Sequence, residues 1–273
     1  MWKLSLAVTI LVILALAFLA VAKSWLARGP VKLSKGPSRL LLAKAQPSES
    51  TQIPRQIFMT TRKKSEIPEK VKENWTYFLE DIPLVIFDDE EAATFVEQHF
   101  TEQVVRAYRK LKGAHRADLF RYCVLYQYGG LYLDIKSKLT QPIGSFINFH
   151  SMENLLYTAL STTPGTIYQG IIATPPGSAI MLRAIQAIVR TPKLAPKFHY
   201  HVFTTQLYRI LLDETNGPLK PGENELRNGG KLILFSEICQ PLCSTPDRYG
   251  KCCKLELFGK PVMDVRWPDY PWR

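Results

Sequence analysis

The residues best suited to chemistry lie in one stretch, RADLFRYCVLYQYGGLYLDIK, from Arg116 to Lys136. Asp118 and Arg121 are three residues apart, so a helix would place them on one stripe of its surface. Asp134 follows an apolar strand pattern, and a carboxylate at the carboxyl end of a strand in an open α/β sheet stands where such folds bind ligands. Arginine suits phosphate because its planar fork binds oxygens in pairs. The alternative is a simple surface bridge between Asp118 and Arg121, worth only a few tenths of a kcal/mol.

Two elements must position these groups. Residues 114–128 predict a largely apolar helix that ends at Gly129 and Gly130, because glycine tolerates the positive φ of a helix end. Residues 131–135 then predict a strand. Alternation along that strand puts Tyr132 and Asp134 on one face, opposite the leucines and the isoleucine.

The rest of the body alternates strand and helix patterns. The predicted strands comprise residues 53–59, 84–87, 166–174 and 231–236. The predicted helices comprise residues 66–81, 88–100, 177–190 and 201–213. This order argues for an α/β fold with a mostly parallel sheet.

The pattern D-x-x-R-x-x-x-L-x-x-x-G-G-x-Y-x-D, from Asp118 to Asp134, resembles glycosyltransferase family 32, the DXD-containing sugar-transfer family. That family includes yeast Golgi α-mannosyltransferases and inositol phosphoceramide mannosyltransferases. Ile53-Pro54-Arg55 and residues 170–177 add looser similarity, so the resemblance covers about residues 52–190. It implies a GT-A fold, a Rossmann-like nucleotide-sugar-binding domain that usually uses Mn²⁺.

The resemblance also implies roles for single residues. Asp118 would contact the ribose or the sugar, Arg121 would steady the diphosphate, and Asp134 would be the first acid of the DXD and a metal ligand. A metal and a guanidinium would stabilise the charge that develops on the leaving diphosphate. The implied nucleotide-sugar-binding set comprises Asp118, Arg121, Gly129, Gly130, Tyr132 and Asp134, and the implied catalytic set comprises Arg121, Asp134 and Lys136.

Lys136 stands where the motif expects its second acid, and an ammonium cannot ligate a cation. Strand alternation places it on the face of Asp134, about 7 Å further along. Three outcomes stay open. In the first, Mn²⁺ or Mg²⁺ is held by Asp134 together with diphosphate oxygens, waters and another ligand. In the second, Lys136 supplies the positive charge itself without a metal. In the third, the domain has lost activity and only binds or scaffolds.

The formal net charge of +11 is unevenly distributed. Residues 1–64 hold 11 of the 35 basic residues against one acid, Glu49, whereas residues 65–273 hold 24 bases and 23 acids. The folded body is therefore nearly neutral, which argues against a nucleic-acid partner. The basic segment is typical of a linker beside a membrane, with a polyanion-binding arm as the alternative.

The N-terminus carries a targeting segment. Residues 4–22 form an uncharged run of 19 residues between Lys3 and Lys23, long enough to span roughly 28 Å as a helix. Its length favours a signal anchor, although the basic residues that follow are the wrong charge bias for a cytoplasmic N-terminus. The alternative is a cleaved signal peptide, which Ala20-Val21-Ala22 fits. We expect residues 1–23 to be the anchor or signal peptide, residues 24–52 a basic stem, and residues 53–273 the catalytic domain.

Cysteines and a sequon fit an oxidising lumen. The clustered cysteines, which predict one or two disulfides, are Cys239, Cys243, Cys252 and Cys253. A bond between adjacent Cys252 and Cys253 would be strained, which leaves two pairings. A zinc knot is the alternative, although the spacing matches it poorly. Asn74-Trp75-Thr76 is a candidate glycosylation site.

These observations predict a single-pass Golgi or ER membrane protein with a luminal hexosyltransferase domain. It would move a hexose from a nucleotide-sugar, GDP-mannose first and UDP-sugars second, to a glycan or glycolipid acceptor, with retention. The alternative is a non-catalytic luminal binding or scaffold protein of the same fold.

Overall fold

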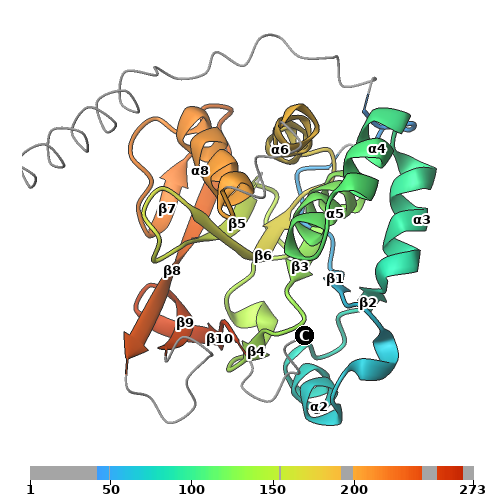
Figure 1. Cartoon of the computed structure of the whole chain (residues 1–273). Helices are drawn as coiled ribbons and strands as arrows, with labels where there is room; N and C mark the ends of the chain where they lie inside the picture. The colour runs from blue at the N-terminus through green and yellow to red at the C-terminus, as the bar shows by residue number, and fades with distance from the viewer. Residues whose placement is uncertain (1–41, 49, 154, 192–198, 242–250, 267–273) are drawn as a thin grey trace, which may run out of the picture. The chain divides into compact units, whose positions relative to one another are not determined.

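The structure is a computed structural model, and it describes residues 42–48, 50–153, 155–191, 199–241 and 251–266 (Figure 1). The predicted signal segment of residues 1–23 and stem residues 24–41 lie outside these ranges. Within them, no helix combines the length and the apolar character needed to cross a membrane.

The described elements alternate as the sequence patterns indicate, with additional strands toward the C-terminus. The helices are α2 (Glu69–Phe78), α3 (Asp89–His99), α4 (Glu102–Lys110), α5 (Ala114–Tyr128), α6 (Ala179–Arg190) and α8 (Val202–Glu214), with short 3₁₀ helices η2 (Lys64–Glu66) and η3 (Ile143–Ser145). The strands are β1 (Ile57–Thr60), β2 (Leu84–Phe87), β3 (Gly130–Leu133), β4 (Lys138–Leu139), β5 (Leu155–Leu160), β6 (Ile167–Thr174), β7 (Gly222–Glu225), β8 (Lys231–Pro241), β9 (Lys251–Leu257) and β10 (Lys260–Asp264).

The strands form one mixed sheet in the order β2-β1-β3-β6-β5-β8-β9-β10-β4, with β7 on β8. β1 is parallel to β2 and β3, and β5 is parallel to β8. The other pairings between described strands are antiparallel. The prediction of a mostly parallel sheet is therefore wrong beyond β3. The sequence prediction also missed β5, which joins β6 through only residues 161–166, a connection too short for a parallel crossover.

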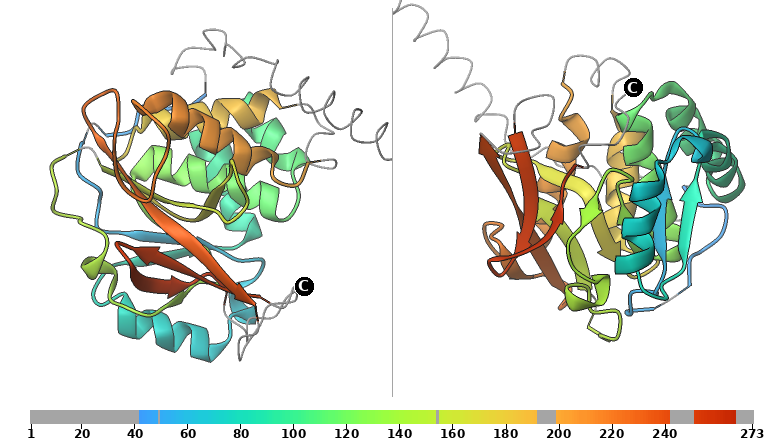
Figure 2. Two further views of the ribbon diagram at one scale, coloured as in Figure 1. Left: turned by 90° about the vertical axis from the view of Figure 1, so that its left-hand side faces the viewer. Right: turned by 90° about the horizontal axis from the view of Figure 1, so that it is seen from below.

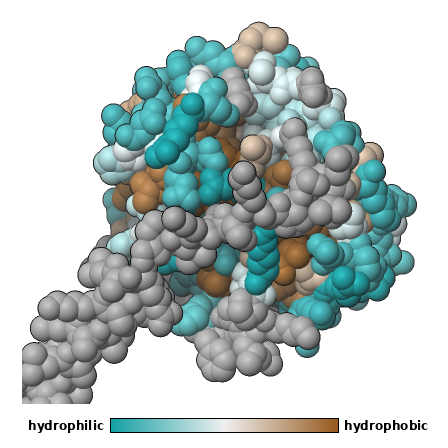
Figure 3. Space-filling model, turned by 90° about the horizontal axis from the view of Figure 1, so that it is seen from above, coloured by the Kyte–Doolittle hydropathy of each residue, from teal (hydrophilic) through white to brown (hydrophobic). Residues whose placement is uncertain are grey.

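Helices cover the two faces of the sheet unequally. One face packs against α3, α4, α5, α6 and α8, and the other against α2 and η3 (Figure 2). Side chains of strand β3 alternate between the two faces. Tyr132 belongs to the hydrophobic cluster on the first face, whereas Leu131 and Leu133 belong to the cluster on the second. Seen from above, hydrophilic residues surround the rim of the molecule and hydrophobic ones show nearer its middle (Figure 3).

The folded domain begins before Ile53. Leu42 and Ala43 are buried, and Ala43 pairs with Phe100 in an isolated antiparallel bridge. The backbone N–H of Thr101 donates to Leu42 O at 2.9 Å. The end of the predicted stem is thus part of the core, because this short apolar segment covers the carboxyl end of α3.

A disulfide fixes the late hairpin. Cys239 of β8 and Cys253 of β9 are paired across the strands with a Cα–Cα distance of 4.0 Å. This bond belongs to one of the two pairings left open by the sequence; Cys252 is also disulfide-bonded, and Cys243 lies outside the described residues. Glu237 lies near the same two sulfurs. Sulfurs joined to each other are not thiolate ligands, so the structure favours the bridge over a zinc knot.

Candidate active site

Helix α5 and the end of β3 bring three predicted residues together. Arg121 Nη2 lies 3.3 Å from Asp118 Oδ1 and 3.2 Å from Asp134 Oδ1. The side chains of Arg121 and Asp118 are only 6% and 12% exposed, so the simple surface bridge is excluded. A guanidinium between two carboxylates is the centre of this site, and we call Asp118, Arg121 and Asp134 the triad.

The remaining donors of Arg121 also face the protein. Its Nε donates to Ala117 O at 3.3 Å, and its Nη1 donates to Gln169 O at 2.5 Å. The guanidinium carbon lies 4.7 Å from the centre of the Tyr132 ring. Arg121 therefore contacts the two carboxylates from the buried side of the site. Its predicted direct contact with a diphosphate stays a prediction.

Burial shapes the electrostatics of the triad. Desolvation raises the pKa of Asp118 to about 6, while the charge of Arg121 limits the rise and Asp134 adds to it. Burial alone would lower the pKa of Arg121, but the carboxylate of Asp134, then Tyr132 and Asp118, raise it above its ordinary value. The Asp118 carboxyl therefore exchanges its proton closer to neutral pH than an ordinary aspartate does.

Tyr132 supports the triad from the sheet. It is 1% exposed, and its hydroxyl shares a 2.9 Å hydrogen bond with Thr60 Oγ1 at the end of β1. Its predicted place on the face of Asp134 is confirmed by its contact with Arg121. Burial makes Tyr132 a positioning residue. Sequence reasoning missed Thr60, although a polar residue ending the strand parallel to β3 was a usable signal.

Asp134 begins a turn. β3 ends at Leu133, and the backbone N–H of Ser137 donates to Asp134 O at 2.9 Å. The strand prediction through Ile135 was wrong because the N–H of Asp134 makes the last bond to β6, 2.8 Å to Gly170 O. Lys136 lies inside this turn and is half-buried, so regular strand spacing does not describe its distance from Asp134.

Gly129 and Gly130 lie at the other end of β3. At Gly129, with φ 65°, a Cβ would lie 2.5 Å from Pro176 N; at Gly130, with φ 92°, it would lie 2.7 Å from Gln56 O. Both glycines are required for close backbone packing where α5 turns into β3. Their predicted contact with the nucleotide-sugar stays a prediction.

Two further polar side chains beside the triad were not singled out from the sequence. Tyr122, one turn after Asp118, and Gln169, whose carbonyl binds Arg121, are both buried. Within the described ranges the Tyr122 hydroxyl and both amide atoms of Gln169 have no hydrogen-bond partner. Desolvation, followed by the charge of Asp118, raises the pKa of Tyr122. Such groups are sites for ordered water or for polar atoms of a ligand.

The triad fits a metal cage poorly. Asp134 is one third exposed, but its Oδ1 contacts Arg121, and Asp118 is turned inward to the same guanidinium. Among the described residues, the acid and cysteine cluster suited to a metal contains neither of them. With lysine at position 136, the motif itself offers Asp134 as its one partly exposed carboxylate.

The predicted glycosylation site, Asn74, lies on α2. The Asn74 Nδ2 donates to Leu139 O at 2.9 Å, and its Oδ1 accepts from Leu139 N–H at 3.0 Å. This side chain therefore ties α2 to β4, while its glycosylation stays a prediction. Two cavities among the described residues, of about 550 and 500 Å³, are not lined by the triad.

Comparison with known proteins gives three similarities. Residues 65–155 match the family described as "Glycosyltransferase sugar-binding region containing DXD motif". Inositol phosphoceramide mannosyltransferase 3 of Schizosaccharomyces pombe is 24% identical over 160 residues, which cover 58% of this chain and 42% of that protein. The chain thus matches less than half of that relative's length. The solved structure of PaToxG Glycosyltransferase aligns with a TM-score of 0.43 and 14% identity, covering 60% of this chain and 69% of that one.

Proposed function

We propose, on the premise that this chain belongs to the glycosyltransferase family whose sugar-binding region contains a DXD motif, that it transfers a hexose from a nucleotide-sugar within a GT-A domain. The observation that carries the proposal is the buried Arg121 holding Asp118 and Asp134 together at the end of β3. A purely structural role would not need two carboxylates on one buried guanidinium, because burying a charged side chain costs several kcal/mol per charge.

In this proposal the triad orients the donor. The partly exposed carboxylate of Asp134 accepts a hydroxyl of the transferred sugar, and Asp118 accepts a hydroxyl of the ribose or the sugar. Arg121 keeps the two carboxylates from repelling each other and fixes their direction before the donor arrives. Lys136, in the turn after Asp134, adds positive charge where the leaving diphosphate becomes negative.

Transfer with retention would proceed by internal return. The C1–O bond to the diphosphate breaks, and the acceptor hydroxyl forms the new bond on the face from which the diphosphate departs. Its proton passes to a diphosphate oxygen, so no protein nucleophile is required. This route agrees with a site whose carboxylates are engaged by Arg121.

The donor and the setting belong to the same proposal. GDP-mannose is the first donor to test, because the S. pombe relative is named as a mannosyltransferase, and UDP-sugars are second. The acceptor would be a glycan or glycolipid at a Golgi or ER membrane, with residues 4–22 as anchor or signal. The need for Mn²⁺ or Mg²⁺ is tested by measuring transfer in excess chelator. If transfer survives the chelator and is abolished by Lys136→Ala, the lysine supplies the positive charge.

Asp134→Asn is the decisive variant. Transfer from GDP-mannose or a UDP-sugar should fall on the order of 10²- to 10³-fold, because the variant removes a charge aimed at the reacting donor. The control is Asp213→Asn, an exposed acid of α8 paired with Arg183, which should leave transfer unchanged. No turnover of any donor by the native chain, together with no nucleotide binding, would favour the non-catalytic scaffold instead.

A further inference from the structure

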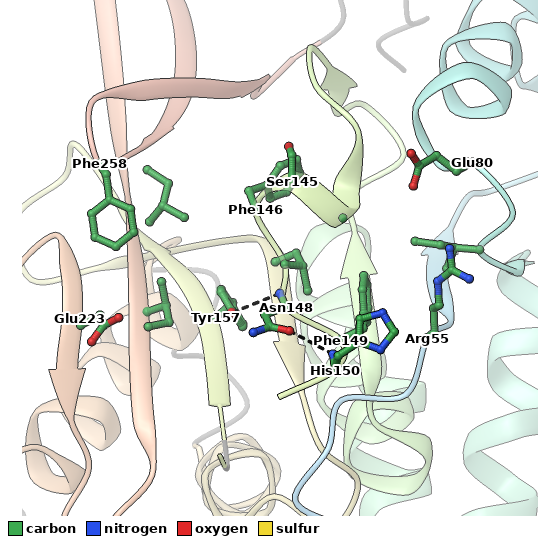
Figure 4. Close-up of a pocket in the computed structure, with 15 residues that line it drawn as sticks. Arg55, Glu80, Ser145, Phe146, Asn148, Phe149, His150, Tyr157, Glu223 and Phe258 are labelled. Atoms are coloured by element: carbon green, nitrogen blue, oxygen red, sulfur yellow. Dashed lines mark hydrogen bonds between the residues drawn. The ribbon is translucent and has the colours of Figure 1, made fainter. Parts of the chain in front are cut away.

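A cavity of about 550 Å³ lies at the opposite end of the parallel strands from the triad. Arg55 precedes β1 and Glu80 precedes β2, whereas Asp134 follows β3, which runs parallel to β1. Figure 4 shows Glu80 and Arg55 on one side of this cavity and Phe258 and Glu223 on the other. Its volume is within the range of small-molecule sites, about 300–1,000 Å³.

Phe258 is held at the cavity in an unfavourable conformation. It is 70% exposed and has φ 51°, and it is followed by Gly259 with φ 77° in the turn between β9 and β10. Two-residue hairpin turns with positive φ at both positions favour asparagine or glycine. A phenylalanine there costs on the order of 1 kcal/mol and also leaves an aromatic ring in water.

The neighbouring strand makes room for this ring. A Cβ at Gly222, at the start of β7, would lie 3.1 Å from Phe258 Cε1. One edge of the ring therefore lies against the backbone of β7 at Gly222, while most of the residue's surface stays open. An exposed aromatic ring is a suitable platform for the apolar C–H face of a sugar.

Polar groups of the cavity have backbone strain or hydrogen bonds of their own. Glu80, with φ 56°, is the other non-glycine residue with positive φ in the described part of the chain, so both such residues line this cavity. Arg55 Nη1 donates to Asp81 Oδ2 at 3.1 Å. Asn148 Oδ1 accepts from the His150 N–H at 3.0 Å. Backbone strain of this kind gathers at ligand sites.

The charges select the class of ligand. Glu80 and Glu223 present carboxylates from opposite sides, and the guanidinium of Arg55 already pairs with Asp81. Lys231 Nζ is 4.0 Å from Glu223 but only 3.1 Å from Glu153. Carboxylates on two walls repel an anionic ligand such as a nucleotide and accept hydrogen bonds from neutral hydroxyl groups.

We propose that this cavity is an auxiliary site for a neutral carbohydrate of one or two rings, stacked on Phe258 and hydrogen-bonded by Glu80 and Glu223. The site is separate from the triad and does not depend on sugar transfer. An experiment that disproves carbohydrate binding at this cavity can therefore be told apart from one that disproves sugar transfer at the triad.

The test uses the full chain and three neutral disaccharides, α-1,2-mannobiose, maltose and lactose, titrated by ligand-observed NMR. At least one should bind in the millimolar range. Phe258→Asn should weaken that binding at least tenfold while raising the melting temperature, because asparagine suits the turn. A loss of binding through misfolding would instead lower the melting temperature.

Two further variants complete the test. Glu223→Gln should also weaken binding, whereas Met152→Ala, an exposed apolar residue that does not line the cavity, should not. Asp134→Asn should leave disaccharide binding intact even where it abolishes transfer. The proposal is overturned if none of the disaccharides binds up to about 10 mM, or if Phe258→Asn binds as tightly as the native chain.

Discussion

The two ends of the parallel strands present opposite kinds of site. At the carboxyl end of β3, Arg121 and its two carboxylates are buried and bonded to one another. At the amino ends of β1 and β2, the cavity has exposed groups and two strained backbone positions. The first region depends on buried charge, and the second depends on backbone strain. Removing the guanidinium of the first region should therefore destabilise the protein, whereas relieving the positive-φ backbone at Glu80 or Phe258 in the second should stabilise it.

The same difference explains which region could be found in the sequence. The triad comes from 17 consecutive residues, Asp118 to Asp134, so its spacing is visible as a motif. The cavity gathers residues from Arg55 to Phe258, and no local pattern joins them. A contiguous motif shows where chemistry is concentrated, but a site assembled from distant turns needs coordinates.

Arg121→Leu should have the largest effect on stability. It leaves Asp118 buried without its partner, so the free energy of unfolding should fall by about 3–5 kcal/mol, and transfer should be lost. Urea unfolding at neutral pH measures this. Arg109→Leu, which removes an exposed pair with Glu97, should cost at most about 1 kcal/mol. Equal costs for the two variants would mean that the triad is not a buried electrostatic unit.

Asp118→Asn should reveal the raised pKa. Because the pKa of Asp118 is about 6 in the folded protein and 3.8 ordinarily, the folded state binds more protons between these values. The native chain should therefore lose stability relative to Asp118→Asn as the pH rises from 4 to 7, by roughly 1–3 kcal/mol. Unfolding of both proteins at several pH values measures the difference. A difference that does not change with pH would contradict the raised pKa.

Thr60→Val and Tyr157→Phe compare single hydrogen bonds in the two regions. The first removes the 2.9 Å partner of the buried Tyr132 hydroxyl, and should cost about 1–3 kcal/mol and reduce transfer. The second removes the 3.3 Å acceptor of the Asn148 N–H beside the cavity. It should cost about 1 kcal/mol and leave transfer unchanged. Reduced transfer in Tyr157→Phe would mean that the two regions are coupled.

Glu80→Gly should have the smallest effect, and of the opposite sign. Glycine adopts the positive φ after α2 without strain, so the free energy of unfolding should rise by about 0.5–1 kcal/mol. Thermal unfolding detects such a rise. A destabilised variant would show that the Glu80 side chain contributes more contacts than its conformation costs.

Local patterns predicted the elements around the triad well. The bounds of α5, the glycine stop and the start of α3 near Asp88 were all predicted, because each depends on residues within about one helical turn. The end of β3 and the antiparallel pairing of β6 were not. They depend on Gly170 and on the missed strand β5, which lie far along the chain.

The sequence by itself determined that Asp118 and Arg121 share a helical stripe and that Asp134 follows the next strand, since these relations are set by the periods of helix and strand. Only the tertiary structure decided where Arg121 points. The Gln169 carbonyl and the Tyr132 ring occupy its inner side, so the guanidinium is turned into the protein and holds the carboxylates instead of meeting solvent. The cavity at the opposite strand ends also exists only in three dimensions, because Gly222 and Phe258 meet through sheet pairing.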